Sequence, residues 1–515
     1  MAEIHDLSAV ELIELYRKKA LSPVEATRAV LAHIERWEPS LRATYRLDAD
    51  AALLAAKASE ARWRDGNPGA LDGVPILIKD NIVPLGTAAS VLQEAALDAP
   101  PAARVREAGA VIFGKTTMPD YGMLSSGLSS FHPLTRSPWD LSKNPGGSSA
   151  GAAAGAAAGY GPLHIGTDIG GSIRLPAGWC GVFGLKPSLG RVPIDPPYIG
   201  RVAGPITRTV TDAALLMRVL SRPDGRDHMS LPDQSCDWLA LERDVRGLKL
   251  GLLLDVGCGL AVEPQVRAAV EAAARAFATA GAIVEPMKPF LTGAVLDGVD
   301  YFWRMRAWAE LSALEAARRA KVLPFILDWA EAAAKLSGLE LFRCFNQVFV
   351  MRQSAHGACR AYDYVLCPTA PIPAFAAELP CPTNDPARPF EHIAFTVPFN
   401  MSEQPAASIN CGYTREGLPI GLQIVGKRFD DLGVLQLARS YETIRPAQRP
   451  WPRPPPACGI KLKGIGTRSD FSKKEGPRNV LRPLSTGRKM PFRCHETDAV
   501  SNWQHDLNAP RPRWL

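Results

Sequence analysis

Two clusters of glycine and serine constrain this chain more than any other feature. The first lies at residues 146–149 (GGSS) and the second at 170–172 (GGS), with an alanine- and glycine-rich helical segment and a short apolar stretch between them. Consecutive glycines let the backbone approach a reacting group closely, or adopt dihedral angles that other residues avoid. The two clusters therefore predict a site built partly from main-chain N–H groups.

Length and cysteine usage indicate a cytoplasmic protein with a large core. The 515 residues, 46% of them apolar, can form one large α/β domain or two or three smaller ones. The chain has no apolar run of the roughly 18 residues that span a bilayer, and its first residues lack the basic-then-apolar order of a signal peptide. The ten cysteines are scattered without a C-x-x-C pair, which is typical of reduced thiols rather than of disulfides or a zinc site.

The net charge of +7 belongs to one end of the chain. Residues 451–515 hold 13 Lys and Arg against 5 Asp and Glu, whereas residues 1–450 hold 46 against 47. A nearly neutral body argues against a nucleic-acid-binding face, because such affinity depends on clustered positive charge. Residues 459–515 are basic and without periodicity, so we expect a disordered tail. This tail is either a solvated extension or a segment that binds RNA or an acidic membrane.

Helical and strand patterns alternate along residues 1–450, which we interpret as a single large domain. Ser8 and Ser22 each precede a glutamate by three residues, the pattern of a helix capping box. Residues 293–361 are helical without a strand signal, and this block either shapes a pocket beside the site or is plain helical packing. Short apolar runs predict strands at 73–79, 110–114, 181–187, 248–254, 283–287, 364–368 and 417–426. The alternation predicts an α/β fold, a sheet covered by helices on both faces.

Lys79 ends the aliphatic run at 73–79. A lysine at the end of a strand commonly reaches water along its aliphatic stem. A desolvated lysine instead has a lowered pKa and, when neutral, can act as a base. The residues around Lys79 leave both interpretations open.

The first serine cluster suits three kinds of chemistry. GSSAG at 147–151 satisfies the G-x-S-x-G nucleophile elbow with Ser149 as nucleophile, but the elbow needs a buried strand directly before it, and residues 141–145 are a polar loop ending in proline. A phosphate cradle is a second option, yet the sequence has neither the P-loop pattern nor a G-x-G-x-x-G after a strand. The third option uses both serine clusters together with Lys79.

Five segments of the chain resemble the amidase signature family, whose members are Ser–Ser–Lys hydrolases. They are GVPILIKDNI at 73–82, GGSSAG at 146–151, DIGGSIR at 168–174, YVLCPTAPIP at 364–373 and GLPIGLQIVG at 417–426. The resemblance covers most of residues 1–450, with the motifs in the family's order, and does not extend into 459–515. It implies an α/β/α fold around a central mixed sheet, with no metal and no organic cofactor.

The same resemblance assigns three catalytic roles. Ser172 would be the nucleophile that forms an acyl-enzyme. Ser148 would be a bridging serine, held by a cis peptide bond after Gly147. Lys79 would be the base that draws the proton through Ser148, which agrees with the desolvated interpretation of this lysine, because a serine hydroxyl needs a neighbouring base to become a good nucleophile.

Further residues of the motifs would support these three. The backbone N–H groups around Ile169, Gly170, Gly171 and Ser172 would form an oxyanion hole, since consecutive glycines let such groups converge. Asp168 and Arg174 would form a charge pair that braces the loop. Ser149 would cap a helix or form a hydrogen bond behind the catalytic groups.

The expected function is hydrolysis of a carboxylic amide, with a small-molecule amide as partner and without membrane or nucleic acid. One alternative is the A subunit of a tRNA-dependent amidotransferase, which frees ammonia from glutamine with the same triad and works with partner chains. Another is a non-catalytic scaffold, although all three catalytic positions are filled. Specificity is expected in the loop at 118–140 and the block at 293–361. The sequence does not fix the oligomeric state, for which a homodimer is one option.

Overall fold

The computed structural model describes residues 3–82 and 97–456. The tail predicted at 459–515 lies outside these residues. The described chain forms fourteen α-helices, three short 3-10 helices and eleven strands. Both predicted capping boxes are confirmed, at Ser8 with Glu11 and at Ser22 with Glu25.

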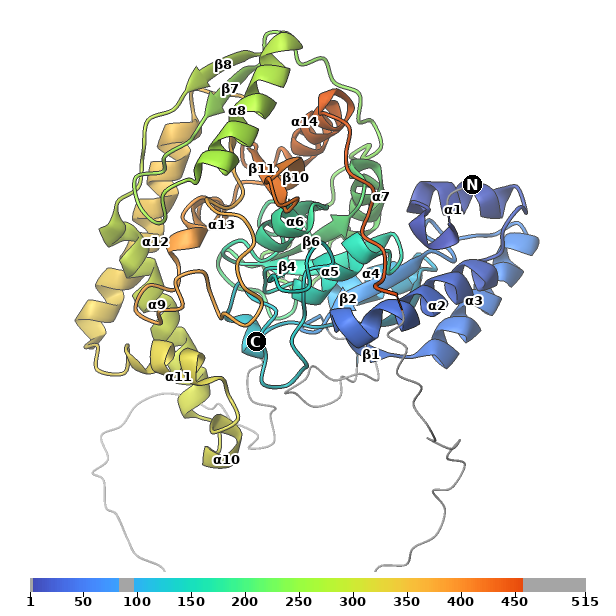
Figure 1. The fold of residues 1–515 in the computed structure, drawn as a ribbon, viewed down its shortest axis with the longest axis horizontal. Coiled ribbons are helices and arrows are strands. Elements are labelled where there is room, and N and C mark those ends of the chain that lie inside the picture. Colours follow the sequence, from blue (N-terminus) through green and yellow to red (C-terminus); the bar gives the residue numbers. More distant parts are fainter. Residues whose placement is uncertain (1–2, 83–96, 457–515) are drawn as a thin grey trace, which may run out of the picture. The chain divides into compact units, whose positions relative to one another are not determined.

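All eleven strands belong to one mixed sheet (Figure 1). They are β1 (Thr44–Leu47), β2 (Pro75–Lys79), β3 (Val111–Thr116), β4 (Leu163–Asp168), β5 (Phe183–Lys186), β6 (Val202–Thr207), β7 (Lys249–Leu252), β8 (Ile283–Pro286), β9 (Tyr364–Pro368), β10 (Ala406–Tyr413) and β11 (Pro419–Val425). Their order across the sheet is β1-β3-β2-β4-β6-β5-β10-β11-β9-β7-β8. β2 is parallel to β3 and β4, and β7 is parallel to β8 and β9, whereas the other neighbours are antiparallel.

The helices connect these strands. They are α1 (Ala9–Arg17), α2 (Pro23–Leu41), α3 (Ala49–Arg64), α4 (Pro100–Glu107), α5 (Ala150–Ala158), α6 (Arg174–Cys180), α7 (Val210–Leu220), α8 (Pro264–Thr279), α9 (Gly293–Ser312), α10 (Ala316–Arg319), α11 (Pro324–Glu331), α12 (Gly338–Cys359), α13 (Val397–Met401) and α14 (Asp431–Ile444). In Figure 1, α1–α3 and the block α9–α12 lie on opposite sides of the central elements. No helix among the described residues is both long enough and apolar enough to cross a bilayer.

The central strands are buried on both faces, whereas the edge strands β1 and β8 are largely exposed. Alternate residues of a central strand belong to different cores. Ile76 and Ile78 of β2 belong to a core that includes α4, α7, α8 and α14, whereas Leu77 belongs to one that includes α2, α3 and α5. On β9, Leu366 joins the first core, and Val365 joins a third core with α6, α9 and α11–α13. The predicted α/β fold, a mixed sheet with helices on both faces, is therefore confirmed.

Candidate active site

Lys79 is the last residue of β2, and its side chain is completely buried. It alternates in step with Leu77, so it points to the sheet face that α5 covers. Lys79 Nζ lies 2.7 Å from Ser148 Oγ and 2.8 Å from Thr167 Oγ1. Burial lowers the pKa of Lys79 well below its ordinary value, and the positive charge of Arg201 lowers it further. The lysine therefore does not reach water: its amine contacts Ser148, and burial favours its neutral form.

Ser148 lies between Lys79 and an open pocket, two residues before α5 begins. The peptide bond from Gly147 to Ser148 is cis. A Cβ atom on Gly147 would come within 2.5 Å of the backbone nitrogen of Ser126, so only glycine fits this position. Close packing of main chain against main chain thus holds Ser148 beside the lysine.

Ser149 is the N-cap residue of α5 by position, but its hydroxyl makes no capping hydrogen bond. The hydroxyl donates to the carbonyl of Thr167 at 3.2 Å and accepts from the Thr167 N–H at 3.3 Å. It joins the first serine cluster to the end of β4. The side chain is fully buried and does not line the pocket. This arrangement does not suit the nucleophile-elbow role for Ser149.

Ser172 follows β4 in the loop that leads into α6, is half-buried, and lines the same pocket as Ser148. The N–H of Ser149 donates to the Ser172 carbonyl at 3.2 Å, which links the two serine clusters directly. Within the described residues no hydrogen bond joins the hydroxyls of Ser148 and Ser172. Catalytic hydrogen bonds are often longer in ligand-free enzymes and shorten when substrate binds.

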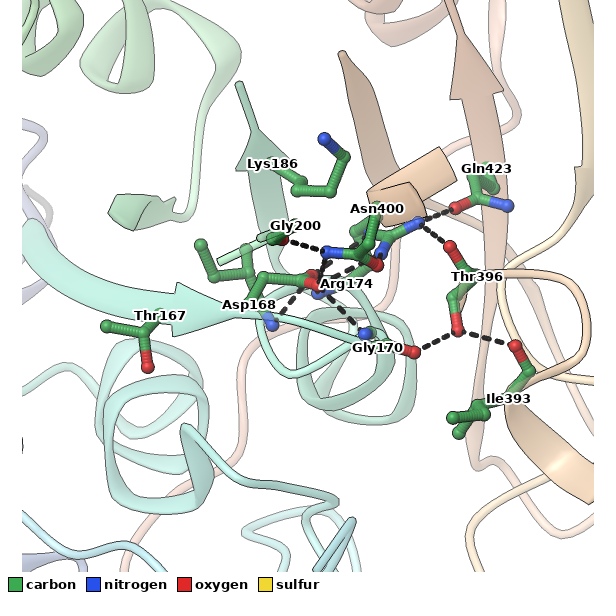
Figure 2. A network of polar contacts seen from close by, with 12 residues as sticks. Thr167, Asp168, Gly170, Arg174, Lys186, Gly200, Ile393, Thr396, Asn400 and Gln423 are labelled. Atoms are coloured by element: carbon green, nitrogen blue, oxygen red, sulfur yellow. Dashed lines mark hydrogen bonds and ion pairs between the residues drawn. The ribbon is translucent and has the colours of Figure 1, made fainter. Parts of the chain in front are cut away.

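A buried ion pair braces the loop between β4 and α6 (Figure 2). Arg174 Nη2 lies 2.9 Å from Asp168 Oδ1, and Asn400 Nδ2 donates to the same oxygen at 2.9 Å. Arg174 Nη1 donates to the carbonyl of Thr396 and to Gln423 Oε1. Burial acts to raise the pKa of Asp168, but Arg174 and Asn400 outweigh it and hold this pKa below its ordinary value. Asp168 is therefore a permanent carboxylate with a fixed partner.

The Asp168 carboxylate also orders the backbone of this loop. Its oxygens accept the N–H of Gly171 at 2.8 Å and that of Ile173 at 3.1 Å. We expected the Gly171 N–H to serve an oxyanion hole, but its bond to Asp168 directs it elsewhere. Gly171 has φ +135°, and a Cβ there would lie 2.6 Å from Thr396 Oγ1, so this position requires glycine.

Three other N–H groups of the loop lack such a partner. Within the described part of the chain, those of Ile169, Gly170 and Ser172 donate to no protein acceptor. The carbonyl of Gly170 accepts from Thr396 Oγ1 at 2.6 Å, which fixes the peptide plane that this carbonyl shares with the Gly171 N–H (Figure 2). The loop thus holds three unpaired donors on residues that line the pocket.

Residues from distant segments line the pocket over the two serines. The loop at 118–140 contributes residues 121–125, and the block at 293–361 contributes Trp303, Arg306, Ala307 and Trp329. Both segments are those in which specificity is expected from the sequence. The remaining lining residues are Asn81, Ser148, Thr167, Asp168, Ile169, Gly170, Ser172, Arg201, Phe390 and Ile393.

Sequence reasoning missed several of these residues. Thr167 directly precedes the DIGGSIR motif, and that adjacency was the one signal for it. Arg201 directly precedes β6, which contains a glycine and a proline and so lacks the sequence pattern of a strand. Phe390 and Ile393 lie in a segment without periodicity. Lys79, Ser148 and Ser172 all come to this site, two lining the pocket and the lysine directly behind Ser148.

The chain is similar to known proteins over most of its length. The Amidase family model matches residues 25–435. The A subunit of the glutamyl-tRNA(Gln) amidotransferase from Myxococcus xanthus (strain DK1622) is 36% identical over 490 residues, covering 85% of this chain and 97% of that protein. A bacterial aryl acylamidase of the amidase signature family has a TM-score of 0.78 and 30% identity, covering 86% and 97% of the two chains. The peptide amidase of Stenotrophomonas maltophilia has a TM-score of 0.74 and 27% identity, covering 87% of this chain and 99% of that chain.

The mixed sheet and these matches define the class of protein: the chain belongs to the Amidase family. It is an amidohydrolase that acts on C–N amide bonds, as the solved amidases that share its fold indicate. The resemblance seen in the sequence motifs is thereby confirmed.

Proposed function

We propose that the chain hydrolyses a carboxylic amide through an acyl-enzyme on Ser172, with Ser148 and Lys79 as the proton relay. The observation that carries the proposal is the 2.7 Å contact between the buried Lys79 amine and Ser148 Oγ, beside the pocket that Ser172 also lines. A lysine whose pKa is lowered by burial can be neutral at working pH and serve as a general base.

In the first half-reaction, Ser172 Oγ attacks the amide carbonyl carbon. Its proton passes to Ser148 Oγ while the Ser148 proton passes to Lys79 Nζ, and the carbonyl π electrons move to oxygen. When the tetrahedral intermediate collapses, the C–N bond breaks. The leaving nitrogen takes a proton from Ser148, which recovers one from Lys79. The products of this step are an ester on Ser172 and free ammonia or amine.

In the second half-reaction, water attacks the ester carbonyl. The same relay accepts the water proton and returns it to Ser172 Oγ as the C–O bond breaks, which releases the carboxylic acid. In both halves, negative charge develops on the former carbonyl oxygen. The N–H groups of Ile169, Gly170 and Ser172 would stabilise it, each donor contributing roughly 3–4 kcal/mol in the transition state.

The test is loss of the nucleophile. The Ser172→Ala protein should retain the thermal unfolding curve of the wild type and lose hydrolysis of p-nitroanilides. A fluorophosphonate probe should label Ser172 in the wild-type protein, as shown by peptide mass spectrometry. The Ser149→Ala protein is the matched control and should still be labelled. Turnover in Ser172→Ala, or label on Ser149, would remove Ser172 from its role.

A second candidate function is that of a glutamine-hydrolysing subunit of a tRNA-dependent amidotransferase. The 36% identity to the Myxococcus xanthus protein, over 97% of its length, favours it. Such a chain should release ammonia from glutamine when mixed with the partner subunits encoded beside it. Ammonia release measured with and without those subunits decides between this role and that of an independent amidase.

The cellular setting and the domain limits are proposals as well. We propose a cytoplasmic enzyme, supported by the described cysteines, all of which are free thiols, and a catalytic domain over 1–450. A chain truncated after 458 should keep its activity, and loss of folding in that protein would contradict the domain limit. Light scattering tests whether the protein is a homodimer.

A further inference from the structure

Arg201 is a buried guanidinium in the pocket without a carboxylate partner. Only 7% of the residue is exposed. Its Nη1 donates to the carbonyl of Pro196 at 2.9 Å, and among the described residues no carboxylate lies within 4 Å of it. Asp195 and Asp227 attract it only from a greater distance. Buried charges in proteins are normally paired, because an unpaired one carries the full cost of desolvation.

The sheet places this guanidinium beside the nucleophile loop. Val202 of β6 pairs with Asp168 of β4, so Arg201 follows in register alongside Ile169. The preceding residue is anchored as well, because Asn400 Nδ2 donates to the Gly200 carbonyl at 3.0 Å (Figure 2). Arg201 is therefore held by the same network that positions Asp168.

A second guanidinium lies near Arg201 in the pocket. Arg306 lines the same pocket, and its Nε lies 3.6 Å from Glu310 Oε1 while its guanidinium stacks over the Tyr198 ring at 4.0 Å. Burial raises the pKa of Glu310 to about 7, although both arginines oppose this. Two guanidinium groups therefore line this pocket, and the positive charge of Arg306 acts on Arg201 together with the attraction of Asp195, Glu310 and Asp227.

We propose that Arg201 binds a carboxylate group of the substrate, so that the enzyme acts on amides that carry a carboxylate elsewhere in the molecule. This inference rests on the proposed function of Ser172. An uncharged amide would bury the guanidinium further without pairing it, whereas a carboxylate supplies the missing partner. Trp303, Trp329 and Phe390 line the same pocket and suit the carbon skeleton between the two polar ends.

The lining also disfavours an ammonium group on the substrate. Among the described residues that line the pocket, the one carboxylate is Asp168, which is committed to Arg174. The α-ammonium of glutamine would meet no partner there. Glutaramate, which is glutamine without its α-amino group, should therefore be the better substrate.

The kinetic test compares matched pairs of anilides, and the first set consists of p-nitroanilides. One member carries a succinyl or glutaryl chain ending in a carboxylate, and the other ends in an isopropyl group of the same shape. A second set places the carboxylate on the leaving amine, as in N-acetyl-4-aminobenzoate against N-acetyl-4-isopropylaniline. Wild-type kcat/KM should favour the carboxylate in at least one set by about 10- to 100-fold, since a hydrogen bond to a charged group is stronger than a neutral one.

Arg201→Met should remove this preference, and Arg201→Lys should retain part of it. Arg191→Met is the matched control, because Arg191 is equally buried but pairs with Asp431 and does not line the pocket. It should keep the wild-type preference. A wild-type enzyme that prefers isopropyl in both sets overturns the proposal, as does an Arg201→Met protein whose two rates fall by equal factors.

A binding measurement tests the proposal without requiring catalytic turnover. Calorimetry on the Ser172→Ala protein should show tighter binding of glutaramate than of 5-methylhexanamide, by a similar factor. Equal affinities would overturn the proposal even if Arg201→Met does not fold. Failure of the proposed function looks different: no anilide is cleaved and no probe labels Ser172, while this binding preference is still measured.

Discussion

Arg174 Nη2 lies 2.9 Å from Asp168 Oδ1, and both side chains are completely inaccessible to solvent. The carboxylate simultaneously accepts the N–H groups of Gly171 and Ile173, on either side of Ser172. One ion pair thus sets the backbone that carries the proposed nucleophile. Because a buried pair gains little over apolar packing but is costly to break, its value here lies in fixing this loop.

Asp168→Asn should therefore be severely destabilising. The substitution leaves the Arg174 guanidinium buried without a counter-charge, which costs about 3–5 kcal/mol of unfolding free energy. Denaturant titration measures this loss. The matched control is Asp244→Asn, whose partner Arg246 is exposed, and it should change the unfolding free energy little. Equal stability of the two variants would contradict a bracing role for Asp168.

Thr167 is placed to hold the proposed base. Its Oγ1 lies 2.8 Å from Lys79 Nζ and accepts from Asn81 Nδ2 at 3.2 Å. Thr167→Val removes this contact at nearly constant volume, and kcat/KM should fall by about 10- to 100-fold because small misplacements of catalytic groups are costly. Thr167→Ser keeps the hydroxyl and should recover most of the rate. The acid limb of the pH profile should also shift downward in Thr167→Val, since the charged lysine loses an acceptor; a purely structural role would leave that limb unmoved.

Lys79 determines the expected pH dependence of catalysis. Only its neutral form accepts a proton, so log kcat/KM should rise with unit slope as pH approaches the pKa of Lys79 and then level off. Because burial places this pKa well below that of an ordinary lysine, the plateau should begin far below pH 10.5. Lys79→Ala should lose about 10²- to 10⁴-fold in rate, and Lys79→Arg, which stays charged, should be equally impaired.

A second buried lysine makes the assignment testable. Burial lowers the pKa of Lys186 to about 7, and its Nζ donates to the Pro187 carbonyl away from the pocket lining. The Lys186→Met protein should keep the acid limb of kcat/KM. Disappearance of the limb in this protein would mean that Lys186, and not Lys79, titrates in the profile.

The sequence predicted those parts of the site that local signals specify. An aliphatic run ending in Lys79 and two glycine–serine clusters are contiguous patterns, and each folds as a strand end or a tight loop. The residues that complete the site are not contiguous. The acceptors of Arg174 at Thr396, Asn400 and Gln423 lie 222 to 249 residues further along the chain, and only the folded sheet brings them together.

Four strands escaped prediction, β1, β4, β6 and β10, and the last two share a physical reason. β6 contains Gly204 and Pro205, residues that usually interrupt strands, and β10 consists largely of small and polar side chains. Both lie inside the sheet with a neighbour on each side, so pairing on two edges overrides weak local propensity. Because β6 was not predicted, Arg201, which directly precedes it, was not predicted as a site residue.

The buried histidine of β4 makes stability depend on pH. His164 is completely inaccessible, and neither ring nitrogen has a hydrogen-bond partner among the described residues. Burial lowers its pKa to about 3, and Arg208 adds to this. Below pH 6.5, His164 is protonated in the unfolded chain but stays neutral in the folded one. Folding stability therefore falls as pH decreases from about 6.5 toward 3. Between pH 8 and pH 5 the expected loss from this one group is about 2 kcal/mol.

His164→Leu should remove that loss. The quantity compared is the change in unfolding free energy between pH 8 and pH 5, in the variant and in the wild type. Asp212 acts in the opposite sense, because burial raises its pKa to about 7 and the folded chain then binds the extra proton. The wild-type slope therefore combines His164 with other buried groups, among them Asp212, Glu310 and Lys186, whereas the His164→Leu difference isolates one. His356→Leu, on the exposed side of α12, is the matched control and should follow the wild type. If denaturant titrations at pH 8 and pH 5 give His164→Leu the same loss as the wild type, His164 is protonated in the folded protein and this account of its burial is wrong.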